Sequence, residues 1–271
     1  MAKPKKPKNV PLQPIGRGIT ADYARALRKV LQDAFDRVDR ELIPQLEYIS
    51  ISAGNYSGTR KDASWPVYLA GLVNSIDTNH NVIAVPAYNL QAESHGLLMS
   101  NFNERATNRN LSSIIGVDVA TSVVGYSDLM NAWTIENVNL IQSVDSKFFN
   151  EIEGMVSRGV RNGTRPETMS KEIRSRYGVT KNRANLIARD QMAKLNGQLT
   201  RHRQESLGIT EYIWRTSQDE RVRTQHSQLN GKRFKYSEPP ISCGSSHANP
   251  GQCYQCRCTA SPVINVDELW A

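Results

Sequence analysis

Four cysteines and two histidines near the C-terminus are the residues whose types and spacing could do chemistry. The cysteines are Cys243, Cys253, Cys256 and Cys258, in the spacing C-x9-C-x2-C-x-C. His247 lies inside the long gap, and His226 lies further upstream. Cysteine sulfur and imidazole nitrogen are ligands that Zn²⁺ prefers, so this group could enclose one tetrahedral ion.

Three interpretations of this group are open: a structural zinc site, a disulfide, or buried free thiols. We favour zinc, with Cys256, Cys258, Cys243 and His226 as ligands and Cys253 and His247 as alternative ligands. If Cys256 and Cys258 lie in a strand, both side chains point to one face, as two ligands of one ion must. The metal would hold together a loop-rich end that has little core of its own.

The N-terminus and the hydropathy pattern bear on where these cysteines are made. The basic start "MAKPKKPKNVPLQP" is followed by no apolar core, so the sequence does not predict a secretory signal. The longest apolar stretch is interrupted by Asp118 and several small polar residues, so no membrane partner is expected. A reducing cytoplasm favours metal binding over disulfides.

The charge distribution predicts an anionic partner. The chain carries a formal net charge of +8. Between Gly154 and Tyr236 it has 18 basic and seven acidic residues, a net charge of +11. We expect non-specific contacts to the phosphates of double-stranded DNA. The expected contact residues are Lys3, Lys5, Lys6, Lys8, Arg174, Arg176, Lys181, Arg183, Arg201 and Arg203.

Hydrophobic periodicity predicts an α+β fold, mostly helical at first and then a small mixed domain with a short antiparallel sheet. Helices are expected over residues 19–43, 88–115, 129–158, 164–178 and 180–208. Thr20 is the expected N-cap of the first helix, and Pro44 should end or kink it. Strands are expected near 209–217, 232–236 and 260–266. The predicted domains are a flexible basic arm (1–18), a helical domain (19–130), and a C-terminal domain (131–271) with basic helices and a cysteine-rich end.

Two further functions can be read from local motifs. Two helices joined at Gly178 could form a helix-turn-helix over residues 167–195, which would make the protein a sequence-specific DNA-binding regulator. An αα-hairpin with a solvated basic face would give the same pattern. His226, with Asp219 seven residues before it, could serve a metal-dependent enzyme, but the sequence favours a protein that is not an enzyme.

The order of the C-terminal motifs resembles the Mu F-type minor head proteins of tailed phages, also called phage head morphogenesis proteins. The matching motifs are Ile187–Arg189, Trp214–Thr216, Asp219–His226, Leu229 with Gly231, Pro250–Gly251 and Cys256–Cys258. The resemblance covers roughly residues 135–264. Where the family often has Thr-Glu after Ile-Ala-Arg, this chain has Asp190 and Gln191.

The resemblance implies a virion protein bound near the portal inside the head, present in the host cytoplasm during assembly. It implies the portal protein, the major capsid or scaffold protein and double-stranded DNA as partners, with the helical domain (19–130) docking portal or capsid. Because domains of this family also occur fused to toxins, a toxin-like domain using His226 is the alternative that the resemblance leaves open. It also implies a role in head assembly, DNA packaging or DNA delivery. Members often lack a cysteine at the position of Cys253, so a zinc site shared by the family favours Cys256, Cys258 and His226 as ligands.

Overall fold

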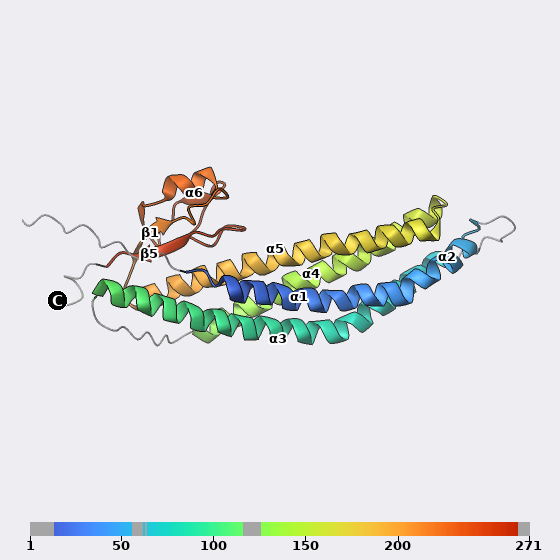
Figure 1. Ribbon diagram of the computed structural model, residues 1–271, viewed down its shortest axis with the longest axis horizontal. Coiled ribbons are helices and arrows are strands. Elements are labelled where there is room, and N and C mark those ends of the chain that lie inside the picture. The colour runs from blue at the N-terminus through green and yellow to red at the C-terminus, as the bar shows by residue number, and fades with distance from the viewer. Residues whose placement is uncertain (1–13, 56–61, 63, 116–125, 265–271) are drawn as a thin grey trace, which may run out of the picture. The chain divides into compact units, whose positions relative to one another are not determined.

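The computed structural model describes residues 14–55, 62, 64–115 and 126–264. Its helical part comprises α1 (Arg17–Arg37), the π-helical turn η1 (Val38–Leu42), the 3-10 turn η2 (Ile43–Gln45), α2 (Leu46–Ser52), α3 (Trp65–Ile115), α4 (Tyr126–Arg161) and α5 (Pro166–Ser206) (Figure 1). The mixed part comprises β1 (Glu211–Arg215), α6 (Thr224–Leu229), β2 (Arg233–Lys235), β3 (Ile241–Cys243), β4 (Ser246–His247) and β5 (Thr259–Pro262).

This element order confirms the predicted α+β class. In the described residues up to Ser206 the regular elements are helices, and after it come short antiparallel strands. The strand β1 lies between β2 and β5, with Tyr212 opposite Phe234 and Trp214 opposite Ala260. A separate hairpin pairs β3 with β4. The lysines of the predicted arm lie outside the described residues.

The chain divides into two compact units that are not consecutive in sequence. One takes residues 22–93 and 134–188, and the other takes 1–21, 94–133 and 189–271. The division therefore does not follow the predicted boundary between residues 130 and 131. The reason is that α3 and α5, with 51 and 41 residues, each supply one segment to each unit.

The unit formed by residues 22–93 and 134–188 is a helical bundle with an apolar core. Its core includes Val38, Leu42 and Ile49 from the first helices and Ile76 from α3. The helix expected over residues 129–158 is confirmed within α4. Of its apolar stripe, Ile141, Val144, Phe148 and Ile152 are buried, and Met155 is partly buried against the same core. Pro44 lies in the 3-10 turn between α1 and α2, as its predicted kink requires.

Two local predictions about the first helices were wrong. Thr20 is not an N-cap, because α1 begins earlier and the Thr20 hydroxyl donates to the Gly16 carbonyl within the first turn. The helix expected from residue 88 begins at Trp65 and runs through Pro86, whose side chain is exposed. A proline on the solvent side leaves the buried face of α3 intact, so packing outweighs the local signal.

The predicted break at Gly178 was also wrong, because α5 continues through it. Gly178 is exposed, and no atom lies within 4 Å of where its Cβ would be. Thr180, the expected cap of a second helix, donates instead to the Arg176 carbonyl within α5. Without a turn there is no helix-turn-helix at residues 167–195, and the regulator hypothesis loses its structural basis.

A buried histidine lies between two carboxylates inside the helical bundle. His80 is fully buried, with Nδ1 3.0 Å from Asp33 Oδ2 and Nε2 3.3 Å from Asp145 Oδ2. Only a protonated ring can donate from both nitrogens at once. Burial disfavours the charged ring, but the hydrogen bonds and charges of Asp145 and Asp33 outweigh it and raise the pKa of His80 above 6.5.

We predict that this cluster makes the stability of the bundle depend on pH. A raised pKa in the folded state means that the stabilisation is complete below the pKa of an unfolded histidine and is lost as pH rises through the folded value. The difference in unfolding free energy between wild type and His80→Gln should therefore shrink from about pH 6 upward. Denaturant titrations across this range measure it, with the exposed His247→Gln as control. A difference that does not change with pH would contradict the prediction.

Candidate metal centre

The residues that follow α5 form a small lobe, residues 209–264, called the C-terminal lobe below. Its core contains Tyr212 and Trp214 from β1, Tyr236 after β2, and Ala260 from β5. The remaining buried members of this core are Ala248, Cys253, Cys256 and Cys258. Cysteines therefore supply a large share of a small core, and their chemistry bears directly on how this lobe is held together.

Three of the predicted ligands converge in this core. His226, Cys256 and Cys258 are all buried, and their ligand atoms lie within 4.8 Å of one another. His226 Nδ1 lies 3.7 Å from Cys256 Sγ and 3.5 Å from Cys258 Sγ. Two sulfurs and one imidazole nitrogen facing a common point form a ligand set that could hold a metal ion.

The His226 ring is held with one particular nitrogen toward the sulfurs. His226 Nε2 lies 2.9 Å from the Ser242 carbonyl oxygen. A carbonyl only accepts, so Nε2 carries a proton, and in the neutral ring the lone pair is on Nδ1, which faces the sulfurs. The Trp214 ring packs edge-on against the imidazole, with centroids 5.5 Å apart, and fixes its plane.

The two thiols differ in acidity because they interact with each other. Hydrogen bonds from Cys258 and His226 to its sulfur lower the pKa of Cys256 to about 4, against the opposing effect of burial. The pKa of Cys258 is raised, because its sulfur faces that of Cys256 and is buried. The Cys256 sulfur in turn raises the pKa of His226. A thiolate is the form in which cysteine acts as a nucleophile or a metal ligand.

The other two cysteines are joined to each other, which corrects part of the predicted ligand set. Cys243 and Cys253 form a disulfide, with their Cα atoms 5.4 Å apart. Neither sulfur is available to an ion, so Cys243 is not a ligand in this structure, nor is the alternative Cys253. The alternative His247 is exposed and contacts the Pro239 carbonyl instead. The cysteine pattern therefore divides into a disulfide and a pair of buried thiols.

Cys256 and Cys258 do not lie in a strand, as the sequence had suggested. They lie in the segment just before β5, after a turn in which Gln255 has a positive φ of 54°. Asp190 of α5 holds this turn, because its Oδ1 accepts the Gln255 backbone N–H at 2.5 Å. Arg257, between the two cysteines, forms a bidentate ion pair with Asp219 at 2.5 and 2.7 Å.

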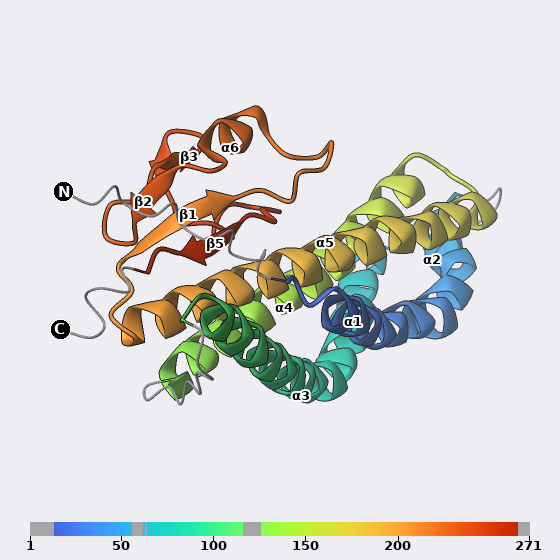
Figure 2. The same cartoon turned by 60° about the vertical axis from the view of Figure 1, so that its left-hand side comes forward.

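Backbone contact with α5 positions the same segment from its other end. A Cβ on Gly197 would lie 2.8 Å from the Pro250 carbonyl oxygen, so only glycine fits there. Gly251 has φ +88° and packs its Cα against the same helix position. One heptad further along α5, Gln204 donates to the Ala260 carbonyl at 3.3 Å. The end of α5 accordingly runs beside β1 and β5 (Figure 2).

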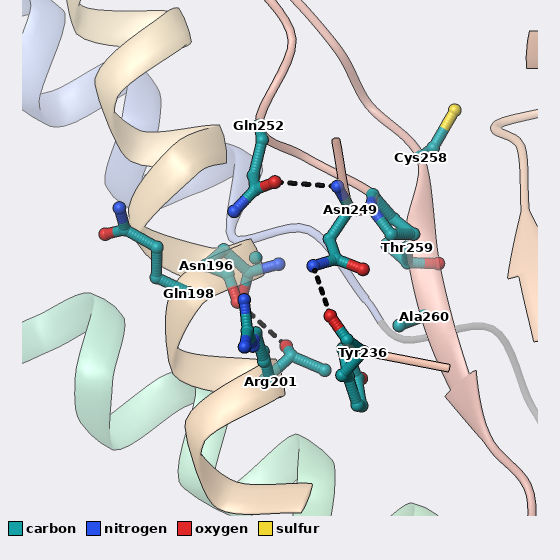
Figure 3. Close-up of a pocket in the computed structure, with 12 residues that line it drawn as sticks. Asn196, Gln198, Arg201, Tyr236, Asn249, Gln252, Cys258, Thr259 and Ala260 are labelled. Carbon is teal, nitrogen blue, oxygen red and sulfur yellow. Dashed lines mark hydrogen bonds between the residues drawn. The ribbon is translucent and has the colours of Figure 1, made fainter. Parts of the chain in front are cut away.

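A polar pocket lies where the lobe meets this part of α5. Asn196, Arg201, Tyr236, Asn249 and Gln252 are among the residues that line it (Figure 3). Gln252 accepts from the Asn249 backbone N–H, and the Asn249 side chain donates to the Tyr236 carbonyl. These contacts tie neighbouring loop segments to one another, and Cys258 lies at the pocket's edge.

The predicted DNA contacts are placed very differently from one another. Lys181 and Arg183 are exposed on α5. Arg174 and Arg176 form ion pairs with Asp39 and Glu151 respectively. Arg201 pairs with Glu205 at 3.0 Å.

The prediction that Arg203 contacts DNA was wrong. Arg203 is 2% exposed and donates to Asn103 and Ser100 of α3, so it cannot reach a phosphate. Its arginine type suggested a DNA contact, but the residue packs α5 against α3.

Comparison with known proteins places this region in a family. Residues 150–261 match the family described as Phage Mu protein F like protein. This part of the chain is a Mu F-like domain. An uncharacterised protein of Haemophilus influenzae is 32% identical over 169 residues, which cover 61% of this chain and 37% of that protein. The chain thus spans little more than a third of that relative's length. No solved structure matches the chain.

The geometry explains the motifs by which the Mu F-like domain resembles its family. Trp214 and His226 are parts of the lobe's core beside the two free thiols. Gly231 has φ +82°, which the turn between α6 and β2 requires. Sequence reasoning missed the role of Asp190, although its replacement of a family threonine was visible. A disulfide was one of the three open interpretations, but the sequence did not predict that Cys243 pairs with Cys253, and the close backbone approach at Gly197 was missed.

We predict that Gly197→Ala destabilises the Mu F-like domain although alanine favours helices. The added Cβ meets backbone that cannot move aside cheaply, so the net loss should be about 1–3 kcal/mol. Gly178→Ala is the matched control, because the space around that Cβ is open, and it should stabilise by about 0.5–1 kcal/mol. Equilibrium unfolding measures both. Equal effects of the two substitutions would show that the contact at Gly197 is not tight.

Proposed function

We propose that this protein is a minor head protein of a tailed phage that acts in head morphogenesis. In this role it binds near the portal inside the capsid, contacts the portal protein and the major capsid or scaffold protein, and touches packaged DNA without reading its sequence. The observation that carries the proposal is the Mu F-like domain over residues 150–261. From Arg189 onward, the motif residues of that domain lie in one compact unit with the last part of α5.

The charge of α5 supports the DNA contact. Lys171, Arg174 and Lys181 are exposed, and their spacing places them on one face of the helix together with Gly178. The opposite face is apolar and buried, with Met169, Ile173 and Ala184 at its centre. A basic outer face on a continuous helix suits phosphate contacts, which carry affinity and no sequence information.

The membrane is not needed as a partner in this proposal. None of the helices in the described part of the chain combines the length and the apolar character that crossing a bilayer demands. His226, the residue on which an enzymatic alternative depends, is 3% exposed. A macromolecular substrate could not reach a ring buried to this extent.

We expect the protein in phage particles. Mass spectrometry of washed virions and of purified proheads, from the phage that encodes the chain, should detect it at a few copies per particle relative to the major capsid protein. A host-cell lysate without particles serves as the background. Absence from both virions and proheads would contradict the proposed function.

We also expect duplex DNA binding that weakens steeply with salt. Each phosphate contact contributes about 0.9 to the slope of log affinity against log salt concentration. Replacing Lys171 and Lys181 with glutamine should reduce that slope by about 2 if both touch phosphate. Titrations of random and fixed-sequence duplexes in about 50–200 mM salt measure this slope.

The matched control for this titration is Lys232→Gln with Lys235→Gln. These lysines are also exposed, but they lie in and just before β2 in the C-terminal lobe. Replacing both removes the same net charge as replacing Lys171 and Lys181. The control should leave the slope closer to that of wild type. Equal slopes for both double variants would show that binding follows net charge and not the face of α5.

A further inference from the structure

We propose that Cys256 Sγ, Cys258 Sγ and His226 Nδ1 bind one zinc ion, and that the Cys243–Cys253 disulfide is a separate cross-link that takes no part in binding. The ion would join α6, which carries His226, to the segment before β5, which carries both thiols. The inference does not depend on the proposed role in phage heads.

The distances fit a tetrahedral ion. Zinc binds sulfur at about 2.3 Å and imidazole nitrogen at about 2.0–2.1 Å. With tetrahedral angles, a bound sulfur and a bound nitrogen therefore lie about 3.6 Å apart. His226 Nδ1 lies 3.7 and 3.5 Å from the two sulfurs. Both sulfur–nitrogen separations thus match those of two ligands of one tetrahedral ion, and the two sulfurs lie within 4.8 Å of each other.

The ligand types and their support select zinc among common ions. Two sulfurs and one nitrogen are soft ligands that suit zinc and not magnesium or calcium, which prefer oxygen. The Ser242 carbonyl holds a proton of His226 on Nε2, so in the neutral ring the lone pair that can bind a metal is on Nδ1, toward the sulfurs. Metal-binding histidines commonly donate the N–H of their other ring nitrogen to a carbonyl or carboxylate, as His226 does here.

The surroundings of the site assign a role to the disulfide. Cys243 directly follows Ser242 in β3, so the disulfide holds the strand whose carbonyl orients His226. Cys253 lies three residues before Cys256, and its carbonyl accepts the Cys256 N–H at 2.9 Å. The disulfide therefore lies beside both halves of the ligand set without supplying a ligand. Three protein ligands would leave the fourth position of such an ion for a water molecule.

A hydrogen-bonded cluster of two thiols and an imidazole could give similar distances, so the test must detect the metal itself. The full-length protein is purified without added metal or chelator, and its zinc is measured by elemental analysis. The ion is then removed with a chelator and replaced with Co²⁺, whose absorption reports thiolate ligands and coordination number. We expect about one equivalent of zinc per chain, and thiolate-to-cobalt charge-transfer bands from two sulfurs.

Variants distinguish the two pairs of cysteines. Cys256→Ser and Cys258→Ser should each lower bound zinc at least tenfold, because a hydroxyl is a poor zinc ligand. The double variant Cys243→Ser with Cys253→Ser is the control, because it removes the two disulfide sulfurs that lie beside the site but outside the ligand set, and it should retain the ion. Loss of the ion in the control, with retention in the ligand variants, would overturn the assignment.

The wild-type protein alone can also overturn the proposal, whether or not a variant folds. If as-purified protein contains no zinc and binds no Co²⁺, and thiol reagents label Cys256 in the native state, the two thiols and His226 form a cluster without metal. Cobalt spectra that show three or four sulfur ligands would likewise contradict it, because they would require Cys243 or Cys253 as ligands.

Discussion

The C-terminal lobe depends on one close contact of backbone with backbone. The Pro250–Gly251 turn lies directly against α5 at Gly197, where no side chain fits. This contact fixes the start of the segment that carries Cys253, Cys256 and Cys258. Asp190 fixes the same segment one heptad earlier on α5, and Gln204 fixes β5 one heptad later. Positions seven residues apart lie on nearly the same face of a helix, so one face of α5 positions the lobe.

This arrangement suits a lobe whose strands are too short to support a large core. β2, β3 and β4 have three, three and two residues. Specific cross-links supply much of the stabilisation that a larger apolar core would give. They are the disulfide, the ion pair of Asp219 with Arg257, and the group of His226 with two thiols. These cross-links hold the small lobe in one conformation. The helix α5 continues from the lobe's unit into the helical bundle, and the exposed basic residues of α5 lie in that second part.

The sequence predicted the parts of the fold whose signals are local and repeated. The stripe of Ile141, Val144, Phe148 and Ile152 predicted α4, and the β-branched and aromatic residues around Trp214 predicted β1. It failed at Gly178, because glycine is a common helix end, yet α5 continues there through packing of its opposite face. It also failed at Arg203, because an arginine in a basic segment gives no local sign of burial against Asn103. Of the predicted metal ligands, the structure brings together His226, Cys256 and Cys258. Which cysteines pair is set by contacts among β3, the Pro-Gly turn and α5, and spacing alone cannot encode these.

The central claim is that folding brings two sulfurs and one nitrogen to a single metal position while the other two cysteines pair with each other. X-ray absorption spectroscopy at the zinc edge of the purified full-length protein tests it most directly. The account predicts two sulfur neighbours at about 2.3 Å and two nitrogen or oxygen neighbours at about 2.0–2.1 Å, one of them showing the scattering of an imidazole ring. A shell of four sulfurs, or a shell of nitrogen and oxygen alone, would contradict it.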